Sequence, residues 1–224
     1  MADRLSLILP NIEEEGIFKI ISDSRRMFGD GLEIIVVDRS SPEFVRRLRS
    51  TGVRIIRQEG RGVENAVMIG LRAATGDVLM STDADDTHET AGLKAAATLV
   101  QEGRADFVLG NRTKGLQKGS MSLYLRFGNG ALSLLFSILY MTRVHDVLTG
   151  LFAMDRKAFD SIKDVKPYSI GIGFFGAEIA KRGFTIREIN IKYYVRKQGA
   201  SKLARSKLLW GMRTALLMVR KRFS

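Results

Sequence analysis

Short apolar runs alternate with longer stretches of helical periodicity along the first half of the chain. Each short run predicts a buried strand, and each stretch with apolar residues every three or four positions predicts a helix. The predicted strands are Leu5–Leu9, Leu32–Asp38, Val53–Arg57, Asp77–Thr82 and Ala105–Gly110. The predicted helices are Glu13–Phe28, Pro42–Thr51, Gly62–Thr75 and Glu89–Glu102. Regular alternation of the two predicts an α/β fold, with a mostly parallel sheet covered by helices on both faces.

The second half has a less regular pattern. The elements that it predicts are helices over Ser122–Met141, Ile172–Arg182 and Leu203–Phe223, and strands over Leu151–Met154 and Thr185–Lys192. No internal repeat, low-complexity tract or linker interrupts the sequence. We therefore expect one domain over residues 1–202, followed by an amphipathic C-terminal helix over residues 203–224.

Charged residues follow the predicted strands at the edge where parallel sheets bind their ligands. Asp38, Asp83, Asp85 and Arg112 all occupy such positions. Asp83 and Asp85 are separated by one residue, so both carboxylates can face one hard cation, and Mg²⁺ or Mn²⁺ prefers oxygen ligands. A metal held there would bridge a diphosphate and neutralise the charge of a leaving group. The alternative is a surface turn or a helix-capping cluster, and Asp86 is expected to cap the following helix.

The composition narrows the set of partners. With 36 Lys and Arg against 24 Asp and Glu, the net charge of +12 favours nucleic acid, anionic lipid or phosphorylated substrates. Cysteine is absent, which excludes disulfides and thiol nucleophiles and suits a cytoplasmic protein. The N-terminus lacks a signal-peptide pattern, and the longest uncharged run, Phe127–Thr142, is shorter than the ~20 residues that span a bilayer. We therefore expect no membrane crossing.

The C-terminal helix combines an apolar stripe with many cations. The stripe recurs at helical spacing and consists of Leu208, Leu209, Met212, Leu216, Val219 and Phe223. Lysine and arginine residues fall outside it, and Trp210 lies near its boundary, which is typical of helices that lie in a membrane interface. We expect peripheral attachment to an anionic membrane at its inner face, with Ser122–Met141 as a second interfacial element. The alternative is a helix docked on the core with a polar outer face.

Several motifs occur in order along the chain. They are Arg61-Gly62-Val63-Glu64-Asn65-Ala66, Gly76-Asp77, Asp83-Ala84-Asp85, Ala105-Asp106-Phe107-Val108-Leu109-Gly110-Asn111-Arg112, Asp146-Val147-Leu148-Thr149-Gly150 and Arg196-Lys197-Gln198-Gly199-Ala200-Ser201-Lys202-Leu203. Together they resemble the motifs of glycosyltransferase family 2, particularly the branch of dolichyl-phosphate mannose synthases and polyprenyl-phosphate glycosyltransferases. The resemblance spans nearly the whole chain. It implies a GT-A fold, which is a Rossmann-like α/β fold with the metal motif at a strand end.

The resemblance also implies a function for residues 1–202. It is the inverting transfer of a sugar from a nucleotide-sugar to a polyprenyl or dolichyl phosphate, with Mg²⁺ or Mn²⁺ held by Asp83 and Asp85. The residues implied for catalysis are Asp85, Arg112, Arg196 and Lys202. Those implied for nucleotide-sugar binding are Pro10, Asn11, Glu13, Asp38, Arg39, Arg61, Asp83 and Ala84. Those implied for the acceptor phosphate are Arg126, Arg196 and Lys202, where the planar fork of arginine matches phosphate oxygens.

Three departures from the family pattern leave the donor open. Arg39 stands in Val37-Asp38-Arg39-Ser40-Ser41 where the family carries a second acid that touches the base, so Arg39 would stack on the base or bind a phosphate. The first loop, Pro10-Asn11-Ile12-Glu13, is one residue short, and Thr87 replaces a glutamine that often assists the metal. GDP-mannose is suggested by the branch, while UDP-glucose and UDP-N-acetylglucosamine stay open.

The acceptor decides whether a general base is needed. A phosphate monoester has a second pKa of ~6 and is mostly dianionic at neutral pH, so it can attack without losing a proton. His88 is expected near the site without a required chemical role, and Glu178 would either line the site or face solvent. Three other functions remain: a catalytically silent relative, a transferase with a soluble acceptor, and a nucleic-acid-binding protein. We expect no nucleic acid, because the basic residues are dispersed and no recognition motif occurs.

Overall fold

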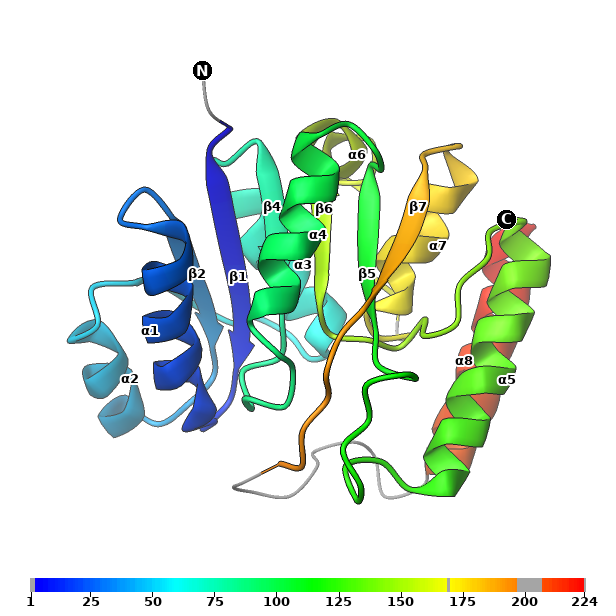
Figure 1. Cartoon of the computed structure of the whole chain (residues 1–224), viewed down its shortest axis with the longest axis horizontal. Coiled ribbons are helices and arrows are strands. Elements are labelled where there is room, and N and C mark those ends of the chain that lie inside the picture. The colour runs from blue at the N-terminus through cyan, green and yellow to red at the C-terminus, as the bar shows by residue number, and fades with distance from the viewer. Residues whose placement is uncertain (1–2, 169, 197–206, 224) are drawn as a thin grey trace.

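The computed structural model describes residues 3–168, 170–196 and 207–223. Its strands are β1 (Leu5–Asn11), β2 (Glu33–Asp38), β3 (Arg54–Arg57), β4 (Val78–Ser81), β5 (Phe107–Asn111), β6 (Phe152–Asp155) and β7 (Ile186–Asn190). Its helices are α1 (Gly16–Phe28), α2 (Pro42–Arg49), α3 (Val63–Ala73), α4 (Ala91–Gln101), α5 (Leu123–Tyr140), α6 (Arg156–Asp160), α7 (Gly173–Lys181) and α8 (Lys207–Arg222). Every strand and helix predicted from the sequence is present, with shifted ends (Figure 1).

Within the described residues, seven strands form one sheet in the order β3-β2-β1-β4-β6-β5-β7. β1 pairs in parallel with β2 and β4, β2 pairs in parallel with β3, and β5 pairs in parallel with β7. β6 is the exception, because it lies antiparallel between β4 and β5. The predicted mostly parallel sheet is therefore confirmed. Because β1, β2, β4 and β5 run in the same direction, their carboxyl ends meet at one edge.

Alternating side chains divide the core between the two faces of the sheet. In β1, Leu7 and Leu9 pack with α1, α2 and α4, whereas Ile8 packs with α3, and all three side chains are fully buried. Figure 1 shows α1 and α4 in front of the sheet and α6 and α7 behind it. Because both faces are covered, β2, β4 and β5 are largely apolar and buried, whereas β3 and β7 are more exposed and contain charged residues.

Three differences between prediction and structure have local causes. α1 begins at Gly16 rather than Glu13, because Glu13 has a φ of 52° and belongs to the preceding loop. α4 begins at Ala91 rather than Glu89, and the expectation that Asp86 caps it is wrong, because Asp86 lies five residues before the helix with a φ of 57°. The periodicity does not predict α6, because a helix of five residues is too short to show a period.

Helix α8 docks along α5 and α7. The Tyr140 hydroxyl on α5 donates to the backbone oxygen of Met218 at 3.2 Å, and Arg222 Nε donates to the backbone oxygen of Leu139 at 2.6 Å. Figure 1 shows α5 and α8 side by side at one end of the sheet, running in the same direction. Among the described residues, α5 is the one helix whose length and composition would allow it to cross a membrane, and 28% of its residues are buried.

Candidate active site

The acid motif lies in the turn that follows β4. This strand is buried along its whole length, and Asp83 and Asp85 follow it at the carboxyl edge of the sheet. Two glycines pack tightly against the turn. A Cβ atom on Gly16 would lie 2.8–2.9 Å from backbone atoms of residues 84–86, and a Cβ atom on Gly150 would overlap the carboxylate of Asp83. The turn is therefore held between the start of α1 and the loop before β6.

The two carboxylates of this turn have different surroundings. Burial and the negative charge of Asp85 raise the pKa of Asp83, so the ionised form of Asp83 is disfavoured until a cation reaches it. Asp85 Oδ1 accepts hydrogen bonds from the Thr87 hydroxyl at 2.6 Å and the Thr87 backbone at 3.2 Å. Asp85 Oδ2 lies 2.9 Å from Nη2 of Arg196. Asp85 thus already has a positively charged partner, the guanidinium of Arg196.

The acid pair fits a divalent cation. Asp83 keeps 37% of its side chain exposed, and its like-charged neighbour disfavours leaving both acids ionised without a counter-ion. Within the described part of the chain, no three His, Cys, Asp or Glu side chains form a group that could hold a metal by themselves. A metal bound by Asp83 and Asp85 would therefore take further oxygen ligands from substrate phosphates and water, which is how Mg²⁺ often binds.

His88 lies beside the acid pair. Its ring is buried, and the centroid of the ring lies 5.2 Å from that of Tyr193. The Nδ1 atom of His88 lies 3.7 Å from an oxygen of Asp83. Burial and the positive charge of Arg112 lower the pKa of His88, so the imidazole is neutral at pH 7. Neither ring nitrogen has a hydrogen-bond partner in the described structure. His88 therefore lies beside the acid pair, and its neutral ring adds no charge there.

A second charged pair lies at the end of β5. The Arg112 guanidinium donates two hydrogen bonds of 2.7 Å to Asp146, and the Arg112 backbone donates a third of 2.9 Å. Asn129 on α5 adds a fourth at 2.8 Å. Burial would raise the pKa of Asp146, but the charge and hydrogen bonds of Arg112 hold it below its usual value. Two nitrogen atoms of Arg112 are therefore already engaged, and its guanidinium lies over the ring of Tyr193 at 5.1 Å.

The loops after β1 and β2 form a hydrogen-bonded unit. Asp38 is buried and accepts from Asn11 Nδ2 at 2.6 Å and from the Ser40 hydroxyl at 2.7 Å. The Ser40 hydroxyl also accepts from the backbone of Glu13 at 2.8 Å, which fixes that residue in its left-handed conformation. Arg39 is exposed and donates to the backbone oxygen of Gly60 at 3.4 Å. Asp38 thus organises the loop, while Arg39 presents its cation at the surface.

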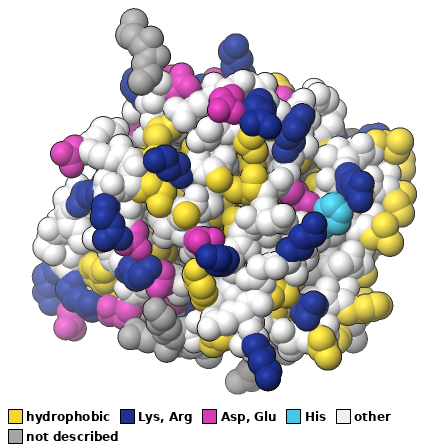
Figure 2. Space-filling model, in the orientation of Figure 1, with side chains coloured by type: hydrophobic (Ala, Val, Ile, Leu, Met, Phe, Trp, Pro, Cys, Tyr) yellow, Lys and Arg dark blue, Asp and Glu magenta, His cyan; other side chains and the backbone are white. Residues whose placement is uncertain are grey.

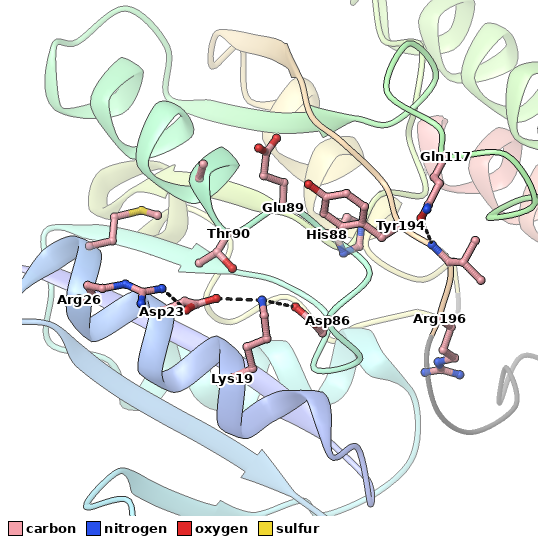
Figure 3. Close-up of a pocket in the computed structure, with 13 residues that line it drawn as sticks. Lys19, Asp23, Arg26, Asp86, His88, Glu89, Thr90, Gln117, Tyr194 and Arg196 are labelled. Carbon is pink, nitrogen blue, oxygen red and sulfur yellow. Dashed lines mark hydrogen bonds and ion pairs between the residues drawn. The ribbon is translucent and has the colours of Figure 1, made fainter.

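A cavity of about 820 Å³ opens beside the acid turn. Figure 3 shows it between α1, which contributes Lys19 and Asp23, and the segment that carries Tyr194 and Arg196. The Lys19 ammonium lies 2.9 Å from both Asp23 and Asp86, so the charges on this wall are paired. Asp86 and His88 line this cavity, whereas Asp83 and Asp85 do not, so the cavity lies next to the acid pair rather than over it.

The remaining predicted residues are spread around this edge. Pro10 is half-buried at the end of β1, and Ala84 is buried between the two acids. Arg61 is exposed in the loop before α3, and Arg126 is exposed on the first turn of α5. Lys202 lies outside the described residues, as does the rest of its motif after Arg196.

Glu178 has a packing role. It is buried on α7, where its carboxylate accepts hydrogen bonds from the Tyr168 hydroxyl at 3.0 Å and from Arg182 at 2.8 Å. Neither alternative from the sequence holds, because the side chain neither joins the acid turn nor faces solvent. The bonds instead tie α7 to the segment that precedes it.

Three further residues belong to this site. Glu14 lies 3.1 Å from Arg196, Tyr193 contacts both Arg112 and His88, and Asp146 neutralises Arg112. Asp146 opens a motif that the sequence displays, although the motif alone does not say what the acid binds. Glu14 and Tyr193 show no signal in the sequence, because their partners lie far away along the chain.

Comparison with known proteins identifies related sequences. The family described as "Glycosyl transferase family 2" has a sequence model that matches residues 6–162. A dolichyl-phosphate hexose transferase of Haloferax volcanii is 32% identical over 192 residues, which cover 85% of this chain and 82% of that protein. A dolichol-phosphate mannosyltransferase of Pyrococcus furiosus is 27% identical over 214 residues, which cover 89% of this chain and 59% of that protein.

Solved structures share the architecture. Glucosyl-3-phosphoglycerate synthase from Mycobacterium tuberculosis, in complex with Mn²⁺, UDP and glucosyl-3-phosphoglycerate, aligns with a TM-score of 0.69 at 21% identity. The alignment covers 98% of this chain and 80% of that one. The same enzyme with Mn²⁺, UDP-glucose and phosphoglyceric acid aligns with a TM-score of 0.71 at 19% identity, over 98% of this chain and 79% of that one. These likenesses concern the fold, and the predicted GT-A fold is confirmed.

Proposed function

This chain belongs to glycosyl transferase family 2 and is a glycosyltransferase, and from this premise we propose that it transfers a hexose from a nucleotide-sugar to a polyprenyl or dolichyl phosphate. The observation that carries the proposal is the acid pair of Asp83 and Asp85 at the carboxyl edge of the sheet, with the cation of Arg196 beside it. The names of both relatives, which are transferases for dolichyl or dolichol phosphate, support the acceptor class.

Each part of the edge has a proposed task. The loop unit of Asn11, Glu13 and Asp38 would receive the nucleoside. Asp83 and Asp85 would hold Mg²⁺ or Mn²⁺, which when bound supplies charge neutralisation on the leaving diphosphate. The Mn²⁺ in a complex of the structurally similar synthase supports the proposal of a divalent ion in a protein of this fold. Preorganised charges of this kind lower the barrier most where water is excluded.

The acceptor phosphate is proposed to be the nucleophile. One of its oxygens bonds to the anomeric carbon while the bond from that carbon to the diphosphate oxygen breaks, so a single displacement inverts the configuration. A dianionic phosphate has no proton to lose, which removes the need for a general base. The buried, neutral His88 is consistent with that chemistry. Arg126 would bind the acceptor phosphate oxygens, and Arg196 and Lys202 would bind phosphate oxygens of both the donor and the acceptor.

The donor is proposed to be GDP-mannose or a UDP-hexose. Arg39 lies exposed beside Gly60 at the loop unit, where an approaching base would meet it. A guanidinium offers hydrogen-bond donors only, so it can contact carbonyl oxygens or ring nitrogens of a base, or a phosphate, but not the N–H groups that an acid would bind. Assays with donors that carry the same sugar on different bases would therefore show which base the enzyme prefers.

We also propose that the enzyme works at the surface of an anionic membrane, at its inner face. Helices α5 and α8 expose large apolar side chains along their outer sides, among them Phe127 at 81% and Leu216 at 69%. Figure 2 shows hydrophobic side chains along the edge that α5 forms in Figure 1. The outward residues on α5 are Leu123, Tyr124, Phe127, Leu134 and Ile138, and those on α8 are Leu209, Met212, Leu216 and Val219.

The docked position of α8 bears on the alternatives for this helix. Its inner side is buried at Thr214 and Met218, as the core-docked alternative requires, but its outer side carries large apolar side chains beside its cations instead of being polar throughout. Arg213 and Arg220 are exposed on the same helix, and each basic residue near an anionic surface adds ~1 kcal/mol of attraction. An apolar face flanked by basic residues is typical of helices that lie in a lipid interface, and it supports this proposal.

Vesicle flotation tests the membrane proposal. The full chain should float with vesicles that contain anionic lipid, and less with purely zwitterionic vesicles. Changing Phe127→Ser and Leu216→Ser together should reduce flotation several-fold, because two large apolar side chains no longer enter the lipid. Val63→Ser, which removes an exposed apolar side chain on α3, is the control and should float like the parent. Equal flotation of all three proteins would contradict the proposed face.

A transfer assay tests the enzymatic proposal. The full chain, with Mn²⁺ or Mg²⁺, is incubated with GDP-mannose, UDP-glucose or UDP-N-acetylglucosamine and a short polyprenyl phosphate in detergent. We expect a glycosyl phosphopolyprenol of inverted configuration from one of these donors. A product formed only with a soluble acceptor would contradict the lipid-phosphate proposal, and binding of random DNA without donor binding would contradict the enzyme.

Two neighbouring acids provide a matched pair of variants for this assay. Asp85→Asn should lower turnover by more than 100-fold, because it removes a metal carboxylate without changing the shape of the side chain. Asp86→Asn should keep most of the activity, because Asp86 pairs with Lys19 rather than with the acid pair, and asparagine tolerates its positive φ. Equal losses in the two variants would contradict the assignment of the pair.

A further inference from the structure

Arg196 bridges two acids from distant parts of the chain. Its Nη2 lies 2.9 Å from Asp85 Oδ2 and 3.1 Å from Glu14 Oε1. Glu14 lies in the loop after β1, Asp85 lies after β4, and Arg196 follows β7. The Arg196 side chain is 22% exposed and both carboxylates are less exposed than that. Water and salt screen the attraction between these charges less than they screen a fully exposed ion pair.

Both oxygens of Asp85 are engaged in this arrangement. Oδ1 accepts two hydrogen bonds from Thr87, which lies two residues further along the same turn. Oδ2 pairs with Arg196, which reaches the turn from the other end of the sheet. A metal ion bound to Asp85 would lie close to the Arg196 cation, and repulsion between the two positive charges favours displacing the guanidinium. The bonds to Thr87 are part of the turn itself, so Arg196 is the partner that can leave without reshaping the turn.

The backbone around Arg196 is anchored independently of its side chain. The Tyr194 backbone donates to the Thr87 oxygen at 2.7 Å, and the Val195 backbone donates to the Gln117 side chain at 2.9 Å. Figure 3 shows Tyr194 and Arg196 on the same segment along one wall of the cavity, with Gln117 beside it. The guanidinium can therefore swing away from Asp85 while the segment stays bound to the acid turn.

We propose that Arg196 occupies the cation position at Asp85 in the free enzyme and is exchanged for the divalent metal when the donor binds. This inference rests on the proposed function in taking Asp85 as a metal ligand. A metal ion alone displaces the guanidinium from Asp85 and leaves it paired with Glu14 instead of with two acids. A metal that arrives with a diphosphate brings anionic oxygens to which the released guanidinium can bind. Metal and nucleotide therefore bind synergistically, and Arg196 couples them.

Calorimetry with Mn²⁺ on the full chain, without and with GDP or UDP, tests the exchange. In the absence of nucleotide, Arg196→Gln should bind Mn²⁺ about 5-fold or more tightly than the parent, the lower end of typical coupling effects. Arg196→Lys should stay close to the parent, because it keeps a cation beside Asp85. The nucleoside diphosphate should tighten Mn²⁺ binding more in the parent than in Arg196→Gln.

Arg47→Gln and Asp85→Asn complete the experiment. Arg47 pairs with Glu15 at 2.6 Å outside the acid turn, so its loss should leave Mn²⁺ affinity unchanged. Asp85→Asn should abolish Mn²⁺ binding. If Asp85→Asn does so but Arg196→Gln binds Mn²⁺ no more tightly than the parent, the exchange is overturned while the proposed metal pair stands. If Asp85→Asn binds Mn²⁺ normally, the proposed metal site itself is overturned.

Discussion

Two clusters of arginine and aspartate lie at the same edge of the sheet and differ in how completely their charges are satisfied. In the first, Asp146 receives two hydrogen bonds from the Arg112 guanidinium, one from its backbone and one from Asn129. One positive and one negative charge meet in a buried, bidentate geometry. This cluster is electrically closed.

The second cluster has an excess of acid. Asp85 and Glu14 share the bridging cation of Arg196, and Asp83 adds a third acid beside Asp85. The Asp83 side chain is about two-thirds covered, and this partial desolvation together with the negative charge of Asp85 raises its pKa. Similar residues at one edge of the sheet therefore have different roles. The closed pair fixes the ends of β5 and α5, whereas the acid-rich cluster keeps negative charge available for a cation.

Removing the acid of the closed pair should have the largest effect on stability. Asp146→Asn leaves the buried Arg112 without a counter-charge, and breaking such a pair costs about 3–5 kcal/mol. Urea denaturation measures the loss. The control is Glu102→Gln, which removes the exposed partner of Arg104 and should cost less than ~1 kcal/mol. Similar small losses in both variants would contradict the structural role of Asp146.

The same variant has a predicted pH dependence. Because the pKa of Asp146 is lowered in the folded protein, its ionisation contributes stability above its ordinary pKa of ~3.9, and that contribution is lost as the pH falls through the folded pKa. The stability difference between the parent and Asp146→Asn should therefore be constant from pH 7 to about 5 and narrow below about 4. Urea denaturation at several pH values measures it, and a difference that widens at low pH would contradict the lowered pKa.

A methyl group at Gly150 should disturb the acid-rich cluster. Gly150→Ala overlaps the Asp83 carboxylate, so the acid must move, at a cost of about 1–3 kcal/mol in stability and with weaker Mn²⁺ binding. Gly128→Ala is the control, because a Cβ there meets open space and alanine stabilises a helix by about 0.5–1 kcal/mol. Calorimetry and thermal unfolding provide the two measurements. Unchanged Mn²⁺ affinity in Gly150→Ala would show that Asp83 keeps its position.

Neutralising Asp83 should have the opposite sign from neutralising Asp146. Asp83→Asn removes one of two crowded like charges, so the metal-free protein should be unchanged or more stable by up to ~1 kcal/mol. Thermal unfolding in the presence of a chelator measures the change. A loss of stability as large as that expected for Asp146→Asn would contradict the difference between the closed pair and the acid-rich cluster.

The smallest effect is expected at the third acid of the turn. Asp86→Asn breaks an ion pair with Lys19, whose side chain is 54% exposed, and such pairs contribute ~0–1 kcal/mol. Stability and Mn²⁺ affinity should both stay close to those of the parent. Loss of Mn²⁺ binding in this variant would mean that Asp86 also belongs to the metal site, in addition to Asp83 and Asp85.

The sequence predicts elements well and partners poorly. The runs that predict β1 to β5 and the periodic stretches that predict α1 to α5 all occur, because apolar periodicity is a local consequence of which face is covered. Arg112 shows the limit. The family resemblance implies a catalytic role for it, but the structure engages two of its guanidinium nitrogen atoms with Asp146, which lies in the loop before β6.

The acid pair after β4 and the basic, cysteine-free composition were determined by the sequence alone, since each is visible within a few residues or in a count. Tertiary structure decided that Arg196 reaches Asp85 and Glu14, that Gly150 packs on Asp83, and that α5 and α8 present one apolar edge. The physical reason is that a side chain's charge state and neighbours depend on strand order and helix packing. These join residues that no local pattern connects.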